Sequence, residues 1–173
     1  MKYLKLSTSE IENELSFERS QFFGSPCFPE NFLEKNKVED DFFLIQINLS
    51  EAFDEILPKK GFIYIFLKID EMPILPKVFY TDTETDEIYQ NINEDFNMED
   101  PSAIYINFDN NSEESVGRIG YVNDDEVELL KIDLSKMPKS FPNFCHENCK
   151  IAFRMTKSEL VALDFTNVKM HLI

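Results

Sequence analysis

The sequence predicts a single α+β domain over residues 1–173, built mostly of antiparallel β-strands with a few short helices. Three observations favour this class. Hydrophobic residues make up 43% of the chain and include 17 Phe, which is ample for a buried core. The apolar segments are short and are separated by turn-forming or acidic stretches, as strands are. The long alternating helices that a parallel sheet requires are not evident.

Two neighbouring apolar segments, 42–49 and 61–69, form the centre of the predicted sheet. The first is nearly continuous, and only Gln46 and Asn48 interrupt it, which is typical of a strand covered on both faces. Both amides must then find hydrogen-bond partners. Either they form the polar floor of a ligand pocket, or they lie on a polar side of the strand or bind the backbone of a loop.

The other elements follow from periodicity and from helix-capping patterns. Helices are expected at 9–19 and 50–56, and a third opens with the capping box Thr156–Glu159. Residues 22–41 are predicted to form an irregular but packed loop, because their phenylalanines would otherwise be exposed. Further strands are expected at 2–6, 77–81, 103–108, 129–136, 149–155 and 168–172.

The last third of the chain resembles the middle third. Leu129–Lys136 aligns with Leu44–Glu51 at a constant offset, and the following Cys149–Met155 corresponds to Phe62–Leu67. Self-similarity of this kind predicts a pseudo-repeat, in which each half has a strand, a short connection and a second strand.

The two related β-rich halves are expected to span roughly 22–81 and 103–173 and to pack together. The insert between them, 82–102, is acidic. Its apolar residues recur at helical spacing, so it is expected to be a short solvated helix or an acidic loop.

The charge of the chain restricts its partners. Lys and Arg number 17 and Asp and Glu number 33, so the net charge is −16. A negative charge opposes binding to phosphate backbones, and no nucleic-acid partner is expected. The charge favours a basic protein as partner, or it keeps the chain soluble.

The predicted compartment is the cytoplasm. The sequence has no run of 18 apolar residues and no signal-peptide core after Met1, so no membrane partner is expected. Cys27, Cys145 and Cys149 are an odd number without framework spacing, in keeping with a reducing compartment. The oligomeric state is left open.

Motifs for catalysis, cofactors and metals are missing from the sequence, which has no P-loop, dinucleotide fingerprint or nucleophile elbow. The segment Cys145–Cys149 holds three potential ligands, but zinc sites need a second pair, so a pair of loop thiols is favoured. The acidic run that starts at Asp82 imitates a calcium loop but lacks its glycine and its final glutamate. No catalytic residue, cofactor or metal is therefore expected.

Three blocks of the sequence resemble a known family. They are the entry loop Phe23–Pro29, the central block Leu44–Phe66 and a closing block made of Gly120–Tyr121, Leu129–Asp133 and Phe153–Val168. In this order they resemble the YwqG-like proteins, a group of unknown function. Ser25 replaces the second glycine of that family's entry loop, tryptophan is absent, and the chain is shorter between its halves. The resemblance implies an α+β fold with two antiparallel sheets, no established catalytic residue, and an immunity or antitoxin role.

Two functions are compatible with these features. The first is a non-enzymatic protein-binding module whose acidic docking surface receives a basic, toxin-like protein. The alternative is a small-ligand binder or enzyme with a cleft between the halves. Nearly all the acids lie in polar, loop-like segments, which favours binding over catalysis. The expected cleft residues are Gln46, Asn48 and Tyr64, and the acidic docking surface comprises Asp82, Glu84, Asp86, Glu87, Glu94 and Asp95.

Overall fold

The computed structural model describes residues 1–7, 18–38, 40–52, 55–69, 73–84, 88–90, 103–138 and 149–173. Within these residues, ten strands form one sheet and two more strands pair separately. All the pairings are antiparallel, which confirms the predicted class. The helices of the described residues are short.

The elements have the following bounds. The strands are β1 (Lys2–Leu6), β2 (Gln21–Phe22), β3 (Cys27–Pro29), β4 (Phe42–Asn48), β5 (Phe62–Lys68), β6 (Leu75–Thr81), β7 (Ile88–Gln90), β8 (Ile104–Asp109), β9 (Gly117–Tyr121), β10 (Glu126–Asp133), β11 (Lys150–Thr156) and β12 (Lys169–Leu172). The helices are α1 (Phe32–Asn36), the 3-10 helix η3 (Leu134–Lys136) and α2 (Lys157–Val161).

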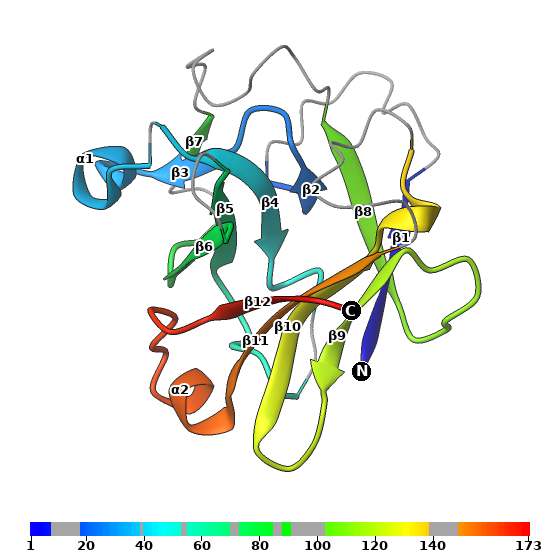
Figure 1. The fold of residues 1–173 in the computed structure, drawn as a ribbon. Helices are drawn as coiled ribbons and strands as arrows, with labels where there is room; N and C mark the ends of the chain where they lie inside the picture. The colour runs from blue at the N-terminus through cyan, green and yellow to red at the C-terminus, as the bar shows by residue number, and fades with distance from the viewer. Residues whose placement is uncertain are drawn as a thin grey trace.

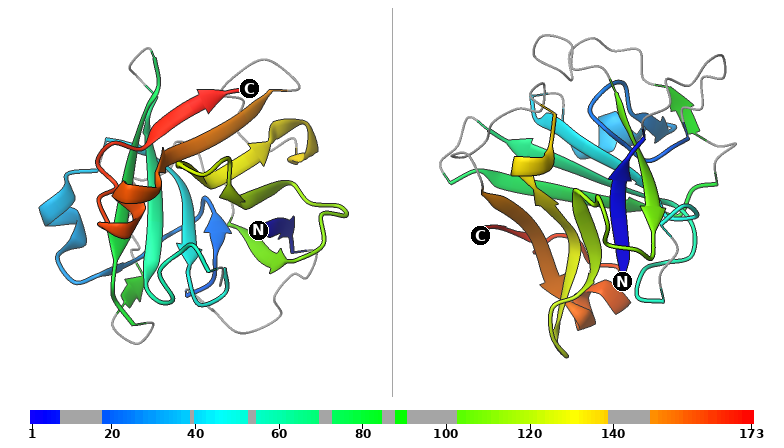
Figure 2. Two further views of the ribbon diagram at one scale, coloured as in Figure 1. Left: turned by 90° about the horizontal axis from the view of Figure 1, so that it is seen from below. Right: turned by 90° about the vertical axis from the view of Figure 1, so that its right-hand side faces the viewer.

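The large sheet curls on itself until its two end strands meet (Figures 1 and 2). Its strand order is β12-β11-β10-β9-β1-β8-β2-β4-β5-β6, so β1 lies in the middle and β6 and β12 are the ends. β6 and β12 lie beside one another but are not hydrogen-bonded to each other. We call the line along which they meet the seam.

The inside of the curled sheet is the main hydrophobic core. Strands from both sides of the sheet contribute to it, because alternate side chains of each strand point inward. The inward side chains include Leu4 of β1, Ile45 of β4, Leu130 of β10 and Phe153 of β11, which are fully buried.

A second, smaller cluster covers the outer face of β4 and β5. We call it the outer aromatic cluster, and its buried members are Phe28, Phe32, Val38, Phe43, Phe62, Tyr64 and Phe66. The rings of Phe28 and Phe32 stack with centroids 4.5 Å apart, and each contacts Tyr64. Because β3 and α1 supply this cover, every residue of β4 is buried, which confirms that the strand is covered on both faces.

Several sequence predictions of secondary structure are confirmed. The strands predicted at 2–6, 42–49, 61–69 and 77–81 correspond to β1, β4, β5 and β6, within a residue or two at their ends. The capping box also forms, since the Thr156 hydroxyl accepts the Glu159 N–H and the Glu159 carboxylate accepts the Thr156 N–H. It opens α2 as expected.

Other predictions are wrong. The described part of 50–56 contains a turn instead of a helix, because Asn48 and not Ser50 accepts the local N–H groups. Residues 22–41 are packed as expected, but they contain the end of β2, β3 and α1 instead of an irregular loop. The strand β9 at residues 117–121 was not predicted. Residues 88–90 form the strand β7, so the helix or loop predicted there from the helical spacing of the apolar residues is wrong. Residues 85–87 and 91–102 of the acidic insert and most of the 9–19 helix lie outside the described residues.

The described residues include no helix long and apolar enough to cross a membrane.

Candidate functional site

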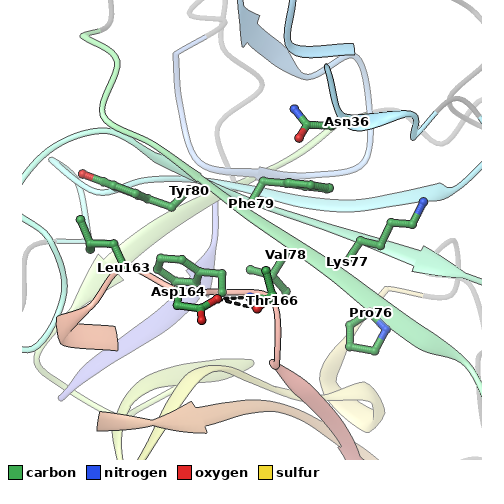
Figure 3. Close-up of a pocket in the computed structure, with 10 residues that line it drawn as sticks. Asn36, Pro76, Lys77, Val78, Phe79, Tyr80, Leu163, Asp164 and Thr166 are labelled. Atoms are coloured by element: carbon green, nitrogen blue, oxygen red, sulfur yellow. Dashed lines mark hydrogen bonds between the residues drawn. The ribbon is translucent and has the colours of Figure 1, made fainter. Parts of the chain in front are cut away.

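A cavity of about 470 Å³ lies at the seam, between β6 and the turn that precedes β12 (Figure 3). Its volume lies in the usual range for ligand sites. Five consecutive residues of β6 line one side and four residues of the turn line the other, with Asn36 of α1 completing it. The lining residues are Asn36, Pro76, Lys77, Val78, Phe79, Tyr80, Leu163, Asp164, Phe165 and Thr166.

The turn at 163–166 is held against β6 by an aromatic contact. Leu163 follows α2 in the left-handed region, with φ +54°, a conformation common at helix C-termini. The next residues carry the chain across the seam, where the Phe165 ring stacks on Tyr80 with centroids 5.8 Å apart. The cavity is therefore bounded by segments from both predicted halves of the chain.

The backbone of β6 is open toward the cavity. Leu49 donates its N–H to the carbonyl of Gly61 at 3.0 Å. Because the backbone groups of successive residues in a strand point to opposite sides, the odd-numbered residues of β5 form hydrogen bonds with β4 and the even-numbered residues form them with β6. In the register of β5 with β6, the even-numbered residues of β5 lie opposite the odd-numbered residues of β6, so the odd-numbered residues of β6 form the hydrogen bonds with β5. The backbone groups of Val78 and Tyr80 consequently point to the seam, where Pro76 adds a carbonyl without an N–H. A proline at this position is typical of an edge strand.

Negative charge gathers at the Tyr80 end of the cavity. The Thr166 hydroxyl and N–H donate to the Asp164 carboxylate at 2.5 and 3.1 Å, and these hydrogen bonds lower the pKa of Asp164. Beyond β6, Asp82 and Glu84 both pair with Lys60 at 3.1 Å. Two carboxylates therefore share one ammonium group, and this part of the surface keeps a net negative charge.

The predicted acidic docking surface is described only in part. The side chains of Asp82 and Glu84 are 57% and 58% exposed, and both lie directly after β6. The remaining members, Asp86, Glu87, Glu94 and Asp95, lie outside the described residues. The docking surface as a whole stays a prediction.

The predicted cleft residues Gln46, Asn48 and Tyr64 lie together, but none of them lines the seam cavity. Gln46 donates to the Arg19 carbonyl at 3.0 Å and accepts the Cys27 N–H at 2.7 Å. These two bonds join β4 to the segment 18–27. Of the alternatives stated for the buried amide, they correspond to the one in which it binds the backbone of a loop.

Asn48 and Tyr64 bind the same segment. Asn48 donates to the Glu18 carbonyl at 2.9 Å, and its own side-chain oxygen accepts the Ser50 N–H at 3.0 Å. The Tyr64 hydroxyl donates to the Cys27 carbonyl at 2.7 Å, and burial raises the pKa of Tyr64 far above its ordinary value. All three side chains thus attach one loop to the sheet.

The cysteines offer no exposed nucleophile among the described residues. Cys27 is a buried free thiol, and burial, followed by the charge of Glu18, raises its pKa to about 12. Cys149 is disulfide-bonded, contrary to the expected pair of loop thiols and to the argument for a reducing compartment. In the described part of the chain, no group of three or more His, Cys, Asp or Glu side chains is placed to hold a metal ion.

Glu128 is a buried charge on β10 that the sequence analysis did not single out. It is 0% exposed, and its two oxygens accept hydrogen bonds from two arginines on the neighbouring strands. Arg118 of β9 donates to Oε1 at 3.0 and 2.7 Å, and Arg154 of β11 donates to Oε2 at 3.2 and 2.9 Å. Burial alone would raise the pKa of Glu128, but the hydrogen bonds of Arg118 and Arg154 outweigh it and lower the pKa.

We expect Glu128 to contribute to acid sensitivity. Because its pKa is lower in the folded than in the unfolded chain, its contribution is complete above the ordinary value of 4.5 and is lost as the pH falls through the folded value. Urea denaturation at a series of pH values should show a shallower loss of stability below pH 4.5 in Glu128→Gln than in the wild type. The exposed Glu84→Gln should keep the wild-type profile. Identical profiles for Glu128→Gln and the wild type would contradict this assignment.

The seam residues were not predicted as a site. Pro76 within a strand pattern was a usable signal, because proline marks edge strands. Nothing local in the sequence indicates that Phe165 meets Tyr80, since their contact depends on the curl of the whole sheet.

No protein-family model matches the chain, and no curated protein matches it.

Proposed function

We propose that this protein is a protein-binding module that takes an extended, basic segment of its partner against the open edge of β6. The observation that carries the proposal concerns the backbone groups of Val78 and Tyr80 that point to the seam, which have no hydrogen-bond partner among the described residues. A strand added to a sheet edge gains backbone hydrogen bonds and places alternate side chains in neighbouring pockets. The seam supplies both of these features.

Charge supports a basic segment. Asp164 at the cavity and Asp82 and Glu84 beyond β6 lie at the same end of the open edge. In the described part of the chain, the ion pairs of these three carboxylates involve Lys60 alone. Lysine or arginine side chains of an added strand would reach these carboxylates. Such complementarity accelerates association and makes it sensitive to salt. A basic, toxin-like protein, and with it an immunity or antitoxin role, is the partner class that this proposal retains.

We further propose that the two halves of the chain are structurally related, so that the end strands β6 and β12, which meet at the seam, occupy corresponding positions in the two halves. The support is a set of matching features: β4 pairs with β5 as β10 pairs with β11, and each pair has a bulge, at Phe43/Ile45 and at Glu128/Leu130. After each first strand, a side-chain oxygen accepts the N–H two residues later, in Asn48–Ser50 and in Asp133–Ser135. The positions differ by the offset of the sequence alignment.

Edge pairing can be tested with proline at the open edge. In Val78→Pro the ladder with β5 is kept, because the N–H that is lost points to the seam, and the preceding residue already has the extended backbone that proline favours. We expect peptides enriched from a displayed library of unstructured sequences to be basic and to bind Val78→Pro at least ~10-fold more weakly, about the net value of one hydrogen bond. Fluorescence anisotropy at low and high salt measures this.

Leu172→Pro is the matched control. Lys150 and Ile173 exchange both backbone hydrogen bonds, at 3.0 and 2.8 Å, so the backbone of Leu172 also points to the seam, but from β12. This variant should bind the enriched peptides as the wild type does. Enriched peptides that are not basic, or that bind Val78→Pro unchanged, would contradict the proposal.

The alternative of a small ligand is favoured by one observation, namely that the cavity lies between segments of the two halves. A small molecule held by the side chains of Tyr80 and Phe165 does not need the backbone N–H of residue 78. Its binding would survive Val78→Pro, which separates the two functions.

A further inference from the structure

A hollow on the opposite side of the sheet gathers positive charge, although the chain as a whole has a net charge of −16. The hollow has a volume of about 210 Å³ and lies on the outer face of β1, β9 and β10, beside η3. We call it the basic hollow, and it is lined by Tyr3, Ser115, Val116, Gly117, Arg118, Lys131, Asp133, Lys136 and Lys150. Four of these side chains are cationic and one is anionic.

The register of the strands brings the cations together. Lys131 of β10 lies directly opposite Arg118 of β9, and Tyr3 of β1 lies opposite Arg118 on its other side. Directly opposed side chains of an antiparallel pair lie about 5 Å apart, and like charges in that position are unfavourable. A violation of a local rule of this kind is expected at functional sites.

Neighbouring carboxylates compensate for only part of the charge. Asp133 pairs with Lys150 at 3.3 Å, and Glu128 is shared between Arg118 and Arg154. Five cations, counting Lys131 and Lys136, therefore face two carboxylates, which leaves 5 − 2 = +3. Asp109 of β8, which lies opposite Tyr3, is paired with Lys5 at 2.9 Å, and Glu113 and Glu114 of the β8–β9 connection do not line the hollow.

Several donors remain available in the basic hollow. Lys136 gives one hydrogen bond to the Ser115 carbonyl, at 2.9 Å, which directs its ammonium group toward the hollow and leaves two donors. Within the described residues, neither the Lys131 ammonium nor the Tyr3 hydroxyl has a hydrogen-bond partner. Together with Arg118 of β9, these groups come from three strands, β1, β9 and β10, and from the 3-10 helix η3.

We propose that the basic hollow binds a small oxyanion of the phosphate type, either free or as the monoester group of a small molecule. A tetrahedral anion with several oxygens matches donors that converge from Arg118, Lys131, Lys136 and Tyr3, and charge-assisted hydrogen bonds are the stronger kind. The volume lies below the range for drug-sized ligands, so only the anionic group itself enters. This site is separate from the seam, and it does not depend on the function proposed there.

Isothermal titration with inorganic phosphate at constant ionic strength tests the site. We expect one phosphate per chain in the wild type and at least ~10-fold weaker binding in Lys131→Gln/Lys136→Gln, which corresponds to about 1.4 kcal/mol. The control is Lys35→Gln, which removes the same kind of charge from an exposed position on α1. It should bind phosphate as the wild type does. A second series with glycerol phosphate distinguishes a free anion from a monoester, and tight binding of either supports the site.

Thermal unfolding gives an independent readout. Without phosphate the double variant should unfold close to the wild-type temperature, because the like-charge repulsion that is removed offsets the lost hydrogen bond from Lys136 to the Ser115 carbonyl. Phosphate should raise the unfolding temperature of the wild type and of Lys35→Gln but not that of the double variant. The proposal is overturned if neither phosphate nor glycerol phosphate binds the wild type, or if Lys35→Gln weakens binding as much as the double variant.

Discussion

Replacing Gln46 by leucine is expected to lower the free energy of unfolding by roughly 2–4 kcal/mol, because two backbone groups lose their partner, a buried one at a cost of about 1–3 kcal/mol and a partly buried one at about 1 kcal/mol. The two groups are the carbonyl of Arg19 and the N–H of Cys27. Leucine is similar in size to glutamine, so the packing of β4 changes little. Urea denaturation followed by circular dichroism measures the loss.

The variant should also release the 18–27 segment locally. Cys27 is buried in the wild type, so its thiol should react slowly with a thiol reagent, whereas in Gln46→Leu it should react well below the urea midpoint. Ile47→Val, on the same strand, is the control for core packing and should cost about 0.5–1.5 kcal/mol without exposing Cys27. A Gln46→Leu protein as stable and as unreactive as the wild type would show that the glutamine does not hold the loop.

Replacing Phe66 by alanine is expected to destabilise the chain by about 3–5 kcal/mol, the usual cost of removing a buried phenylalanine. Phe66 is fully buried in the outer aromatic cluster, where its ring lies 5.4 Å from Phe43, 6.0 Å from Phe79 and 6.1 Å from Phe28. Phe28 belongs to β3 and Phe79 to β6. The void left by the missing Phe66 ring would therefore loosen the packing of β3 on the sheet and the packing of β6 at the seam.

The comparison is with Tyr121→Ala, which removes an aromatic ring that is 43% exposed. It should change the midpoint of urea unfolding far less than Phe66→Ala does. If the two variants were equally stable, the outer aromatic cluster would be a surface patch without a structural role.

The sequence predicts this fold well where the residues of a single strand show a clear hydrophobic pattern. The apolar run of β4 and the alternation of β8 indicate strands without reference to any partner. The short strands β2 and β3 could not be predicted, because two or three residues carry no periodicity and form strands only through their partners, β4 and β7. β9 was missed because Gly117 and Gly120 suggest a turn.

The candidate site could be predicted only in part. The buried amide of Gln46 was recognised as a group that needs a partner, and of the two interpretations the loop-backbone one describes its bonds. The seam and the basic hollow depend on registers and on the curl of the sheet. Arg118 and Lys131 belong to no recognisable motif in the sequence, and the pairing of β9 with β10 places them side by side.

The central position of β1 has a consequence for biosynthesis. Leu4 pairs with Phe108 on one side and with Gly117 on the other, so the ribosome makes β1 long before either of its partners. Within the described residues, the strand pairing that links the two flanks of the sheet, β2 with β4 to β6 and β9 to β12, runs through β1 and β8. The earlier flank can form while translation continues, but the sheet becomes continuous only after β9 has emerged. Contacts this distant in sequence slow folding and prolong the exposure of unpaired strands, so the nascent chain is the stage at which this protein most needs protection from aggregation.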